Sequence, residues 1–150
     1  MSEMKDSGLK YIGLIPSEWN LSKIKFEIKD LYSGGTPESG NSEFYDENGE
    51  KWVAIGDMSN TEQVYDTESH ITKEGIKNKN LKKVPRDTIL YSIYATIGKV
   101  SELKIDAYIN QAILAIYPKS GLFNGYLKYT LKLLEEYALS ECSNSCLLYT

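Results

Sequence analysis

The pattern of apolar and polar positions predicts a β-rich body followed by one long helix. Short runs of β-branched and aromatic residues are typical of strands, and they lie at 51–56, 88–94 and 107–117. From about Asn124 the apolar spacing changes to four, three and four residues, the period of one face of a helix. This helical stripe consists of Leu127, Leu131, Leu134 and Ala138. The order of elements therefore predicts an α+β fold with short helices among the strands.

Residues 21–32 fit two patterns at once. Leu21, Ile24 and Ile28 recur at helical spacing, whereas the apolar residues in the middle of the segment alternate as in a strand. Either element must end at Ser33–Pro37, because its two glycines permit unusual backbone angles and its proline lacks a hydrogen-bond donor. The type of element at 21–32 stays open at this point.

Other local signals complete the expected outline. Residues 38–50 are almost entirely polar and predict a loop. Thr72 is a suitable N-cap for a short helical turn that runs through Ile76. Trp19 and Trp52 are expected in the core, where large aromatic side chains usually lie.

The C-terminal stripe has two interpretations. Positions 127 and 134, like 131 and 138, are seven residues apart, so the helix has the repeat of a coiled-coil seam. Packing of the same stripe against its own domain is the alternative, and both stay open. We place a folded body at residues 1–121 and the helix with its tail at 122–150.

Charge is partitioned along the chain. The overall net charge is −4, which argues mildly against a simple nucleic-acid coat. Residues 31–72, however, carry nine acidic residues and one basic residue, whereas residues 73–104 carry eight basic and three acidic residues. Segment 73–104 therefore has a net charge of +5 and is a candidate phosphate-contacting patch.

Several chemistries are excluded by composition. Cys142 and Cys146 with the single histidine, His70, do not make the two ligand pairs that a zinc site needs. No apolar run approaches the length of a membrane span, and the N-terminus lacks an apolar signal core. We therefore expect a cytoplasmic protein with no metal site and no membrane contact.

One catalytic hypothesis deserves a test. Asp87, Glu102 and Lys104 have the spacing of a carboxylate, carboxylate and lysine set that binds Mg²⁺ in nucleases. Such triplets are common by chance, so a nuclease is an alternative rather than the main hypothesis. No glycine-rich nucleotide-binding motif is present.

Read in order, six segments resemble a known family. They are Ile12–Trp19 (IGLIPSEW), Ser33–Pro37 (SGGTP), Trp52–Met58 (WVAIGDM), Ile71–Ile76 (ITKEGI), Val84–Ser92 with Ala95–Lys99 (VPRDTILYS and ATIGK) and Asn110–Ala112 (NQA). Each segment alone is weak, but their shared order resembles the specificity subunits of type I restriction-modification systems. The resemblance covers about residues 11–139. Asp87 stands where the family often has glycine.

The resemblance implies a non-catalytic DNA reader. Such a subunit has two target recognition domains, each reading one half of a bipartite site, and long spacer helices that form an antiparallel coiled coil. Residues 1–121 would be one recognition domain, and 122–150 the truncated start of a spacer helix. The implied partners are double-stranded DNA, DNA adenine methyltransferase subunits and a restriction/translocase subunit. S-adenosylmethionine, ATP and Mg²⁺ are then expected only on the partner subunits, and this chain has no cofactor and no catalytic residue of its own.

Within that family the residues predict a DNA-binding surface. The predicted DNA-binding residues are Gly34, Gly35, Thr36, Lys82, Lys83, Arg86, Ser92, Tyr94, Thr96, Lys99, Asn110 and Gln111. Glycines let the main chain approach DNA, hydroxyls and lysines contact phosphates, arginine reads guanine, and amides read adenine. The open alternatives are a plain tight turn at the glycines, a polar sheet face at 92–96 and an ion pair within a turn for Arg86.

The C-terminal stripe is the expected partner surface. Leu127, Leu131, Leu134 and Ala138 would face another helix and permit self-association. The absence of a second recognition domain leaves a further alternative, in which the chain is a half-subunit that acts mainly as a dimerisation module.

Overall fold

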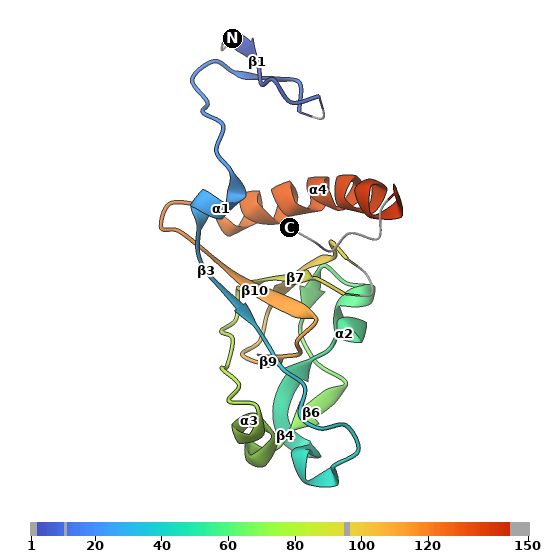
Figure 1. Ribbon diagram of the computed structural model, residues 1–150. Coiled ribbons are helices and arrows are strands. Elements are labelled where there is room, and N and C mark those ends of the chain that lie inside the picture. The colour runs from blue at the N-terminus through green and yellow to red at the C-terminus, as the bar shows by residue number, and fades with distance from the viewer. Residues whose placement is uncertain (1–2, 11, 95–96, 145–150) are drawn as a thin grey trace.

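The protein is described by a computed structural model that covers residues 3–10, 12–94 and 97–144 (Figure 1). The strands are β1 (Met4–Asp6), β2 (Leu14–Pro16), β3 (Ile28–Ser33), β4 (Tyr45–Val53), β5 (Gln63–Val64), β6 (Ser69–Ile71), β7 (Ile89–Ser92), β8 (Val100–Leu103), β9 (Tyr108–Ile109) and β10 (Ile113–Pro118). The helices are α1 (Ile24–Glu27), the 3₁₀ helix η1 (Ser42–Phe44), α2 (Ile55–Ser59), α3 (Lys73–Asn78) and α4 (Asn124–Asn144). This is the predicted α+β fold with short helices.

A five-stranded sheet forms the centre of the body. Its strand order is β3-β10-β7-β8-β5, with antiparallel neighbours except for the parallel pair of β5 and β8. The residues of these strands are strongly apolar, so one face can bury Leu90, Leu103 and Ile113 in the main core. The expected strands at 88–94 and 107–117 are therefore present, although a turn divides the second into β9 and β10.

A three-stranded sheet of order β6-β4-β9 adjoins the first sheet (Figure 1). Val53 at the end of β4 and Ile109 in β9 are fully buried in the main core, which joins the two sheets. Trp52 is buried on the other side of β4 with Ile71 and Tyr108, as expected for a core tryptophan. The predicted loop at 38–50 is wrong in its second half, because residues 45–50 belong to β4.

Helix α4 covers one face of the five-stranded sheet. Leu127 and Leu131 are buried against Ile89, Val100 and Ile116. Lys128 and Lys132 both pair with Glu62 from the α2–β5 connection, which fixes the helix to the body at a second place.

This packing corrects the partner-helix prediction for two residues. Leu127 and Leu131 serve the core of their own domain, because the sheet beneath the helix offers an apolar surface that water would otherwise contact. Leu134 is half-buried, and its role in a partner contact stays a prediction. The side chain of Ala138 lies outside the described residues. The domain boundary at 121/122 also stays a prediction.

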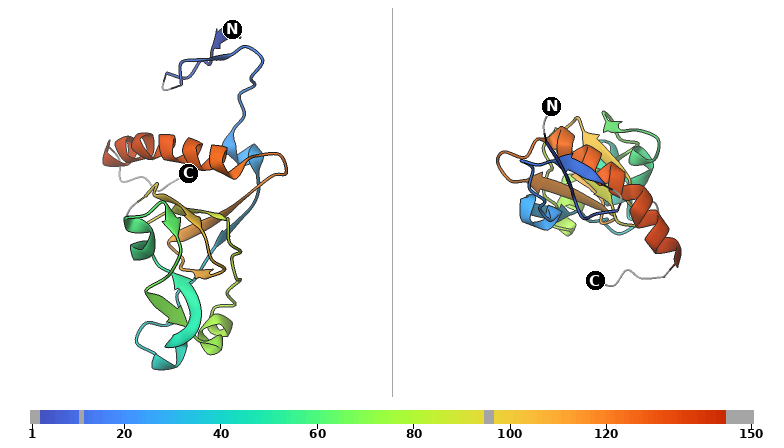
Figure 2. Two further views of the ribbon diagram at one scale, coloured as in Figure 1. Left: turned by 180° about the vertical axis from the view of Figure 1, so that it is seen from behind. Right: turned by 90° about the horizontal axis from the view of Figure 1, so that it is seen from above.

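The N-terminal residues 3–10 and 12–21 form an arm that stands away from the sheets. Strands β1 and β2 pair as an antiparallel hairpin, and Figure 2 shows α4 between this hairpin and the sheets. The hydrogen bonds of the described part of the arm join arm residues only. Trp19 is 52% exposed, so its expected place in the core is wrong.

Both patterns at 21–32 are present, one after the other. Ile24–Glu27 forms α1, and Ile28–Ser33 forms β3.

Within the described ranges, no helix is long and apolar enough to cross a membrane.

Candidate nucleic-acid interface

The turns at one edge of the five-stranded sheet gather most of the predicted DNA-binding residues. At this edge β3 and β7 end and β8 and β10 begin, as the pairs Leu114↔Ser33, Ile113↔Ser92 and Tyr91↔Val100 require. We call it the loop edge, and it comprises residues 33–36, 92–94, 97–99 and 110–112. The turn after β3 therefore meets turns that come more than 50 residues later in the sequence.

Hydrogen bonds hold two of these turns together. Ser33 Oγ donates to the carbonyl of Gln111 at 3.2 Å, and Thr36 Oγ1 donates to Gln111 Oε1. The Asn110 side chain accepts from Ala112 N at 3.0 Å and so shapes its own turn. Gln111 is exposed, and its amide NH₂ has no hydrogen-bond partner among the described residues. Gln111 is thus better placed than Asn110 to contact a base.

Gly34 and Gly35 were predicted to let the main chain approach DNA, but in the structure they let it approach another strand of the same chain. A Cβ at Gly34 would lie 1.8 Å from the carbonyl oxygen of Ile109, and Gly35 N donates to that same oxygen at 3.1 Å. Gly35 O in turn accepts from the Trp52 indole at 3.2 Å. The close backbone approach is therefore to β9 of the same chain, because the turn must cross that strand directly.

The predicted hydroxyl face at 92–96 is only partly available. Ser92 is fully buried and its Oγ accepts from Lys99 N at 2.9 Å, so its expected contact with DNA is wrong in this fold. The strand ends at Ser92, and the chain reverses at Gly98, where φ is +91°. Tyr94 is exposed and Lys99 is half-buried, whereas Thr96 lies outside the described residues.

Two predicted lysines lie next to β3 and β4 rather than in the turns themselves. Lys82 is exposed, its backbone N–H donates to the Tyr32 hydroxyl at 2.9 Å, and its Nζ lies 5.8 Å from that ring centre. Lys83 pairs with Glu50 at 2.7 Å, and this hydrogen bond raises the pKa of the lysine. Within the part of the chain that the structure describes, Lys82 has no ion pair, whereas the charge of Lys83 is balanced by Glu50.

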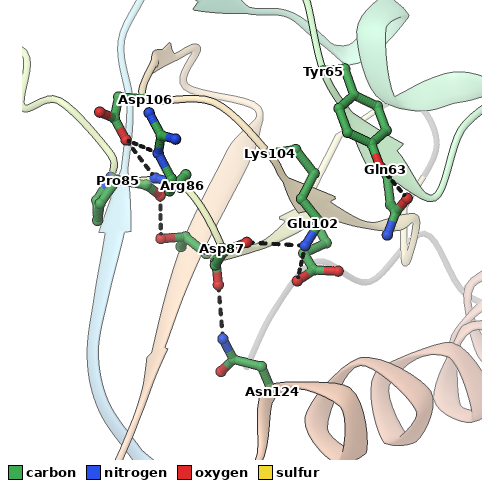
Figure 3. A network of polar contacts seen from close by, with 10 residues as sticks. Gln63, Tyr65, Pro85, Arg86, Asp87, Glu102, Lys104, Asp106 and Asn124 are labelled. Atoms are coloured by element: carbon green, nitrogen blue, oxygen red, sulfur yellow. Dashed lines mark hydrogen bonds and ion pairs between the residues drawn. The ribbon is translucent and has the colours of Figure 1, made fainter.

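Arg86 does not join the loop edge. It lies before β7, at the opposite edge of the sheet, and pairs with Asp106 at 3.4 Å (Figure 3). Hydrogen bonds from the backbone N–H and the guanidinium of Arg86 lower the pKa of Asp106. The alternative of an ion pair within a turn is the one that the structure shows, because Asp106 precedes the bridge between Val84 and Ala107.

Three further lysines, which were not among the predicted DNA-binding residues, add to the basic surface. Lys73, Lys77 and Lys79 are exposed on or just after α3, and within the described ranges none has an ion pair. Lys79 reaches the loop edge, since a Cβ at Gly35 would lie 3.4 Å from its Cβ. The net charge of +5 over residues 73–104 already indicated that these lysines belong to a basic surface.

The nuclease candidates do meet, but in a different role. Lys104 Nζ pairs with Asp87 at 3.0 Å and with Glu102 at 2.8 Å (Figure 3). These hydrogen bonds raise the pKa of Lys104 to about 12. The described residues include no group of three carboxylate, histidine or cysteine side chains able to hold a metal ion. The lysine therefore ties the turn before β7 to the end of β8.

We expect the variant Lys104→Met to lower the melting temperature by a few degrees at pH 7, since two carboxylates then face each other without a cation. The pKa of Lys104 lies above its ordinary 10.5 in the fold, so this stabilisation is complete below pH 10.5. It is lost as the pH rises through 12, and the difference between variant and wild type should shrink over that window. Melting curves from pH 7 to 11.5 measure it. Exposed Lys119 provides the control Lys119→Met, and equal losses for both variants would contradict the assignment.

Comparisons with known proteins identify the family. The chain belongs to the type I restriction modification DNA specificity domain family, whose family model matches residues 16–146. The main expectation from the six segments is thus confirmed.

Curated relatives agree with this assignment. The chain is 35% identical over 124 residues to the type I restriction enzyme MjaIX specificity subunit of Methanocaldococcus jannaschii, covering 81% of this chain and 28% of the relative. It is 29% identical over 118 residues to the EcoR124I/EcoR124II specificity subunit of Escherichia coli, covering 76% and 28%. The chain therefore spans less than a third of the length of these relatives.

Solved structures share the fold. The HsdS subunit from Thermoanaerobacter tengcongensis matches with a TM-score of 0.63 at 18% identity, covering 89% of this chain and 31% of that chain. A second match, described as the structural basis underlying complex assembly and conformational transition of the type I R-M system, has a TM-score of 0.67 at 18% identity and covers 90% and 31%. Both support the α+β architecture.

Proposed function

We propose that this chain is one target recognition domain of a type I specificity subunit and reads one half of a bipartite DNA site. The observation that carries the proposal is the loop edge, where Tyr94, Lys99 and Gln111 lie at the ends of neighbouring strands. Lys79 and Lys82 beside it carry charges without ion pairs among the described residues. Phosphate contacts then orient the duplex, and exposed polar side chains read base edges.

The roles of the individual side chains follow from their contacts. The lysines on and after α3 neutralise phosphates, which supplies affinity without sequence preference. Gln111 offers its amide NH₂ to a base, because Thr36 already holds the amide oxygen. Arg86 and Lys83 take no part, since Asp106 and Glu50 neutralise them.

The remaining activities belong to other subunits in this proposal. The chain directs DNA adenine methyltransferase subunits and a restriction/translocase subunit to the site, in the cytoplasm where these enzymes meet chromosomal DNA. S-adenosylmethionine, ATP and Mg²⁺ bind to those partners, and this chain holds no cofactor. The MjaIX and EcoR124I/EcoR124II relatives support a role as a specificity subunit rather than as a catalyst.

Selection from a pool of randomised duplexes tests the proposal. The chain is combined with its methyltransferase subunit, and bound duplexes are sequenced at moderate salt. We expect enrichment of one short half-site, since specific protein–DNA contacts discriminate each base pair by about 1–3 kcal/mol. Binding without any enriched sequence would refute recognition by this chain.

Two variants separate base reading from phosphate contact. Lys79→Ala should weaken binding to all duplexes equally and reduce the dependence of log K on log[salt] by about 0.9, the contribution of one phosphate contact. Gln111→Ala should instead change the enriched base at one position. Lys119→Ala and Arg86→Ala serve as controls with expected wild-type slopes and preferences. A slope that falls with the control lysine but not with Lys79 would place the interface elsewhere.

A further inference from the structure

The short connection between the end of α3 and the bridge at Val84 carries two lysines that face solvent. Lys79 and Lys82 are both exposed, and neither has an ion pair among the described residues. A lysine side chain loses conformational entropy when it is ordered by a contact with a phosphate. A backbone that is already fixed beneath the lysine limits this loss, so the contacts that hold the connection bear on its use in binding.

The connection starts from a defined helix end. Asn80 follows α3 in the left-handed backbone conformation, with φ of +49°. Leu81 N donates to Ile76 O at 2.9 Å, and Asn80 N donates to Lys77 O at 3.2 Å. These are the two hydrogen bonds of a Schellman motif, which closes a helix and sets the direction of the chain that leaves it. The side chains of Ile76 and Leu81 both pack against the cluster that contains Trp52. The chain therefore leaves α3 in one direction.

Tyr32 holds the next residue of the connection. Its hydroxyl accepts from Lys82 N at 2.9 Å, and its ring centre lies 5.8 Å from Lys82 Nζ. The hydroxyl thus fixes the lysine backbone, and the ring attracts the ammonium group, since cations within about 6 Å of an aromatic ring centre are stabilised. The Tyr32 ring is itself partly buried and packs on the main core. One side chain therefore places both ends of Lys82.

The same tyrosine joins this lysine to the loop edge. Tyr32 lies in β3 directly before Ser33, the first residue of the loop edge. Two residues further along that turn, a Cβ at Gly35 would lie 2.9 Å from Leu81 Cδ2. The end of β3 and its turn thus contact both Leu81 and Lys82. The place of Lys82 relative to the loop edge is therefore set by contacts within the fold.

We propose that Tyr32 is a positioning residue for DNA binding, which holds Lys82 beside the loop edge so that its ammonium group meets a phosphate while the loop edge meets the bases. The inference rests on the DNA reading proposed above and adds to it a residue that acts through another. Phosphate contacts fix the register of a protein on the duplex. A lysine held at a fixed place beside the base-reading turns supplies that register.

A double-mutant cycle on duplex binding tests this role. The chain is combined with its methyltransferase subunit, and its affinity for the selected half-site is measured over a range of salt concentrations. Lys82→Ala should reduce the dependence of log K on log[salt] by about 0.9, the contribution of one phosphate contact. Tyr32→Phe keeps the ring and removes only the hydroxyl, and it should lower the slope in the same direction and weaken binding by about twofold or more. The double variant Y32F/K82A should bind like K82A alone, because the hydroxyl acts through the lysine.

Tyr117→Phe is the matched control, and hydrogen exchange of the free chain gives a readout that needs no DNA. Tyr117 packs on the same core as Tyr32, but among the described residues its hydroxyl makes no hydrogen bond with Lys82. We expect the Lys82 amide to exchange at least about tenfold faster in Y32F than in wild type or Y117F, because its acceptor is lost. The Leu81 amide, which donates to Ile76 O, should exchange as in wild type. A general loosening of the fold would instead accelerate both amides.

The outcomes separate the positioning role from the DNA reading on which it rests. A wild-type chain that selects no duplex would refute the DNA reading, and the positioning role with it. If wild type selects its half-site but Y32F matches Y117F in affinity and salt slope, only the positioning role is overturned. Losses of Y32F and K82A that simply add would show that Tyr32 does not act through Lys82. Equal exchange of the Lys82 amide in both phenylalanine variants would show that the hydroxyl does not hold it.

Discussion

The substitution Gly34→Ala is expected to destabilise the fold by more than about 4 kcal/mol, a loss at the far end of the range for single substitutions. The added Cβ would lie 1.8 Å from Ile109 O and 2.7 Å from Asn110 O, and both are backbone atoms that cannot rotate away. Either β9 must separate from the turn or the hydrogen bond from Gly35 N to Ile109 O must break. Both changes open the main core, in which Ile109 is fully buried.

Urea unfolding followed by circular dichroism measures this loss, and Gly56→Ala is the matched control. Gly56 is an exposed residue of α2, and a Cβ there would meet no atom within 4 Å. Alanine in a helix is favoured over glycine by about 1 kcal/mol, so the control should be neutral or slightly stabilising. Equal stability of the two variants would contradict the crossing of the turn over β9.

The second large effect is expected for Leu127→Ala, with a loss of about 2–5 kcal/mol. Leu127 is almost fully buried between α4 and the sheet, against Ile89, Val100 and Ile116. Truncation leaves a cavity that the paired strands β7, β8 and β10 cannot close without shifting their register. The variant should also loosen α4, since the helix depends on this contact.

Leu133→Ala is the control on the same helix. Leu133 is exposed, so its truncation should change the stability of the monomer by less than about 0.5 kcal/mol. Both variants are unfolded in urea at a low protein concentration at which the unfolding midpoint does not change on dilution, so that self-association makes no contribution. A greater loss for Leu133 than for Leu127 would mean that the other face of α4 packs on the domain.

The strongest local patterns predicted the body of the fold correctly, and weaker ones failed for identifiable reasons. The segment 21–32 carried both a helical and a strand pattern because Ile24 in α1 and Ile28 in β3 pack against the same cluster. Residues 45–50 looked like a loop because Asp46, Glu47 and Asn48 are exposed, although their backbone belongs to β4. The polar composition of residues 45–50 indicates that their side chains are exposed, but it does not indicate whether their backbone pairs with another strand.

The site was predictable only in outline. Motif order indicated which turns matter, and the sheet register then brought the turns after β3 and β7 and before β10 together. Whether a side chain is free to contact DNA depends on hydrogen-bond and ion-pair partners that are distant in the sequence and cannot be read from it. Glu50, 33 residues before Lys83, neutralises that lysine, and the turn at Gly98 places Ser92 under the Lys99 amide.

The stripe on α4 shows the same limit. Its period correctly predicted a helix with one apolar face, because period depends on local geometry alone. The partner of that face is set by tertiary packing, and here it is the chain's own sheet. The exposed residues Tyr126, Tyr129 and Leu133 on the opposite face of α4 recur at a helical spacing as well, and only the structure shows which of the two faces is buried.

Helix α4 spans the sheet from edge to edge. Asn124 at its start donates to Asp87 O at 2.8 Å, and Glu135 lies against Gly98, where an added Cβ would be 3.2 Å from its side chain. If the turn at Gly98 shifts, it must therefore either displace α4 or lose its contact with the helix. We expect the amides of β7, β8 and the first three turns of α4 to exchange hydrogen as one cooperative unit. A movement of the loop edge at Gly98 would then be transmitted along the rigid helix to its start at Asn124, with no hinge between them.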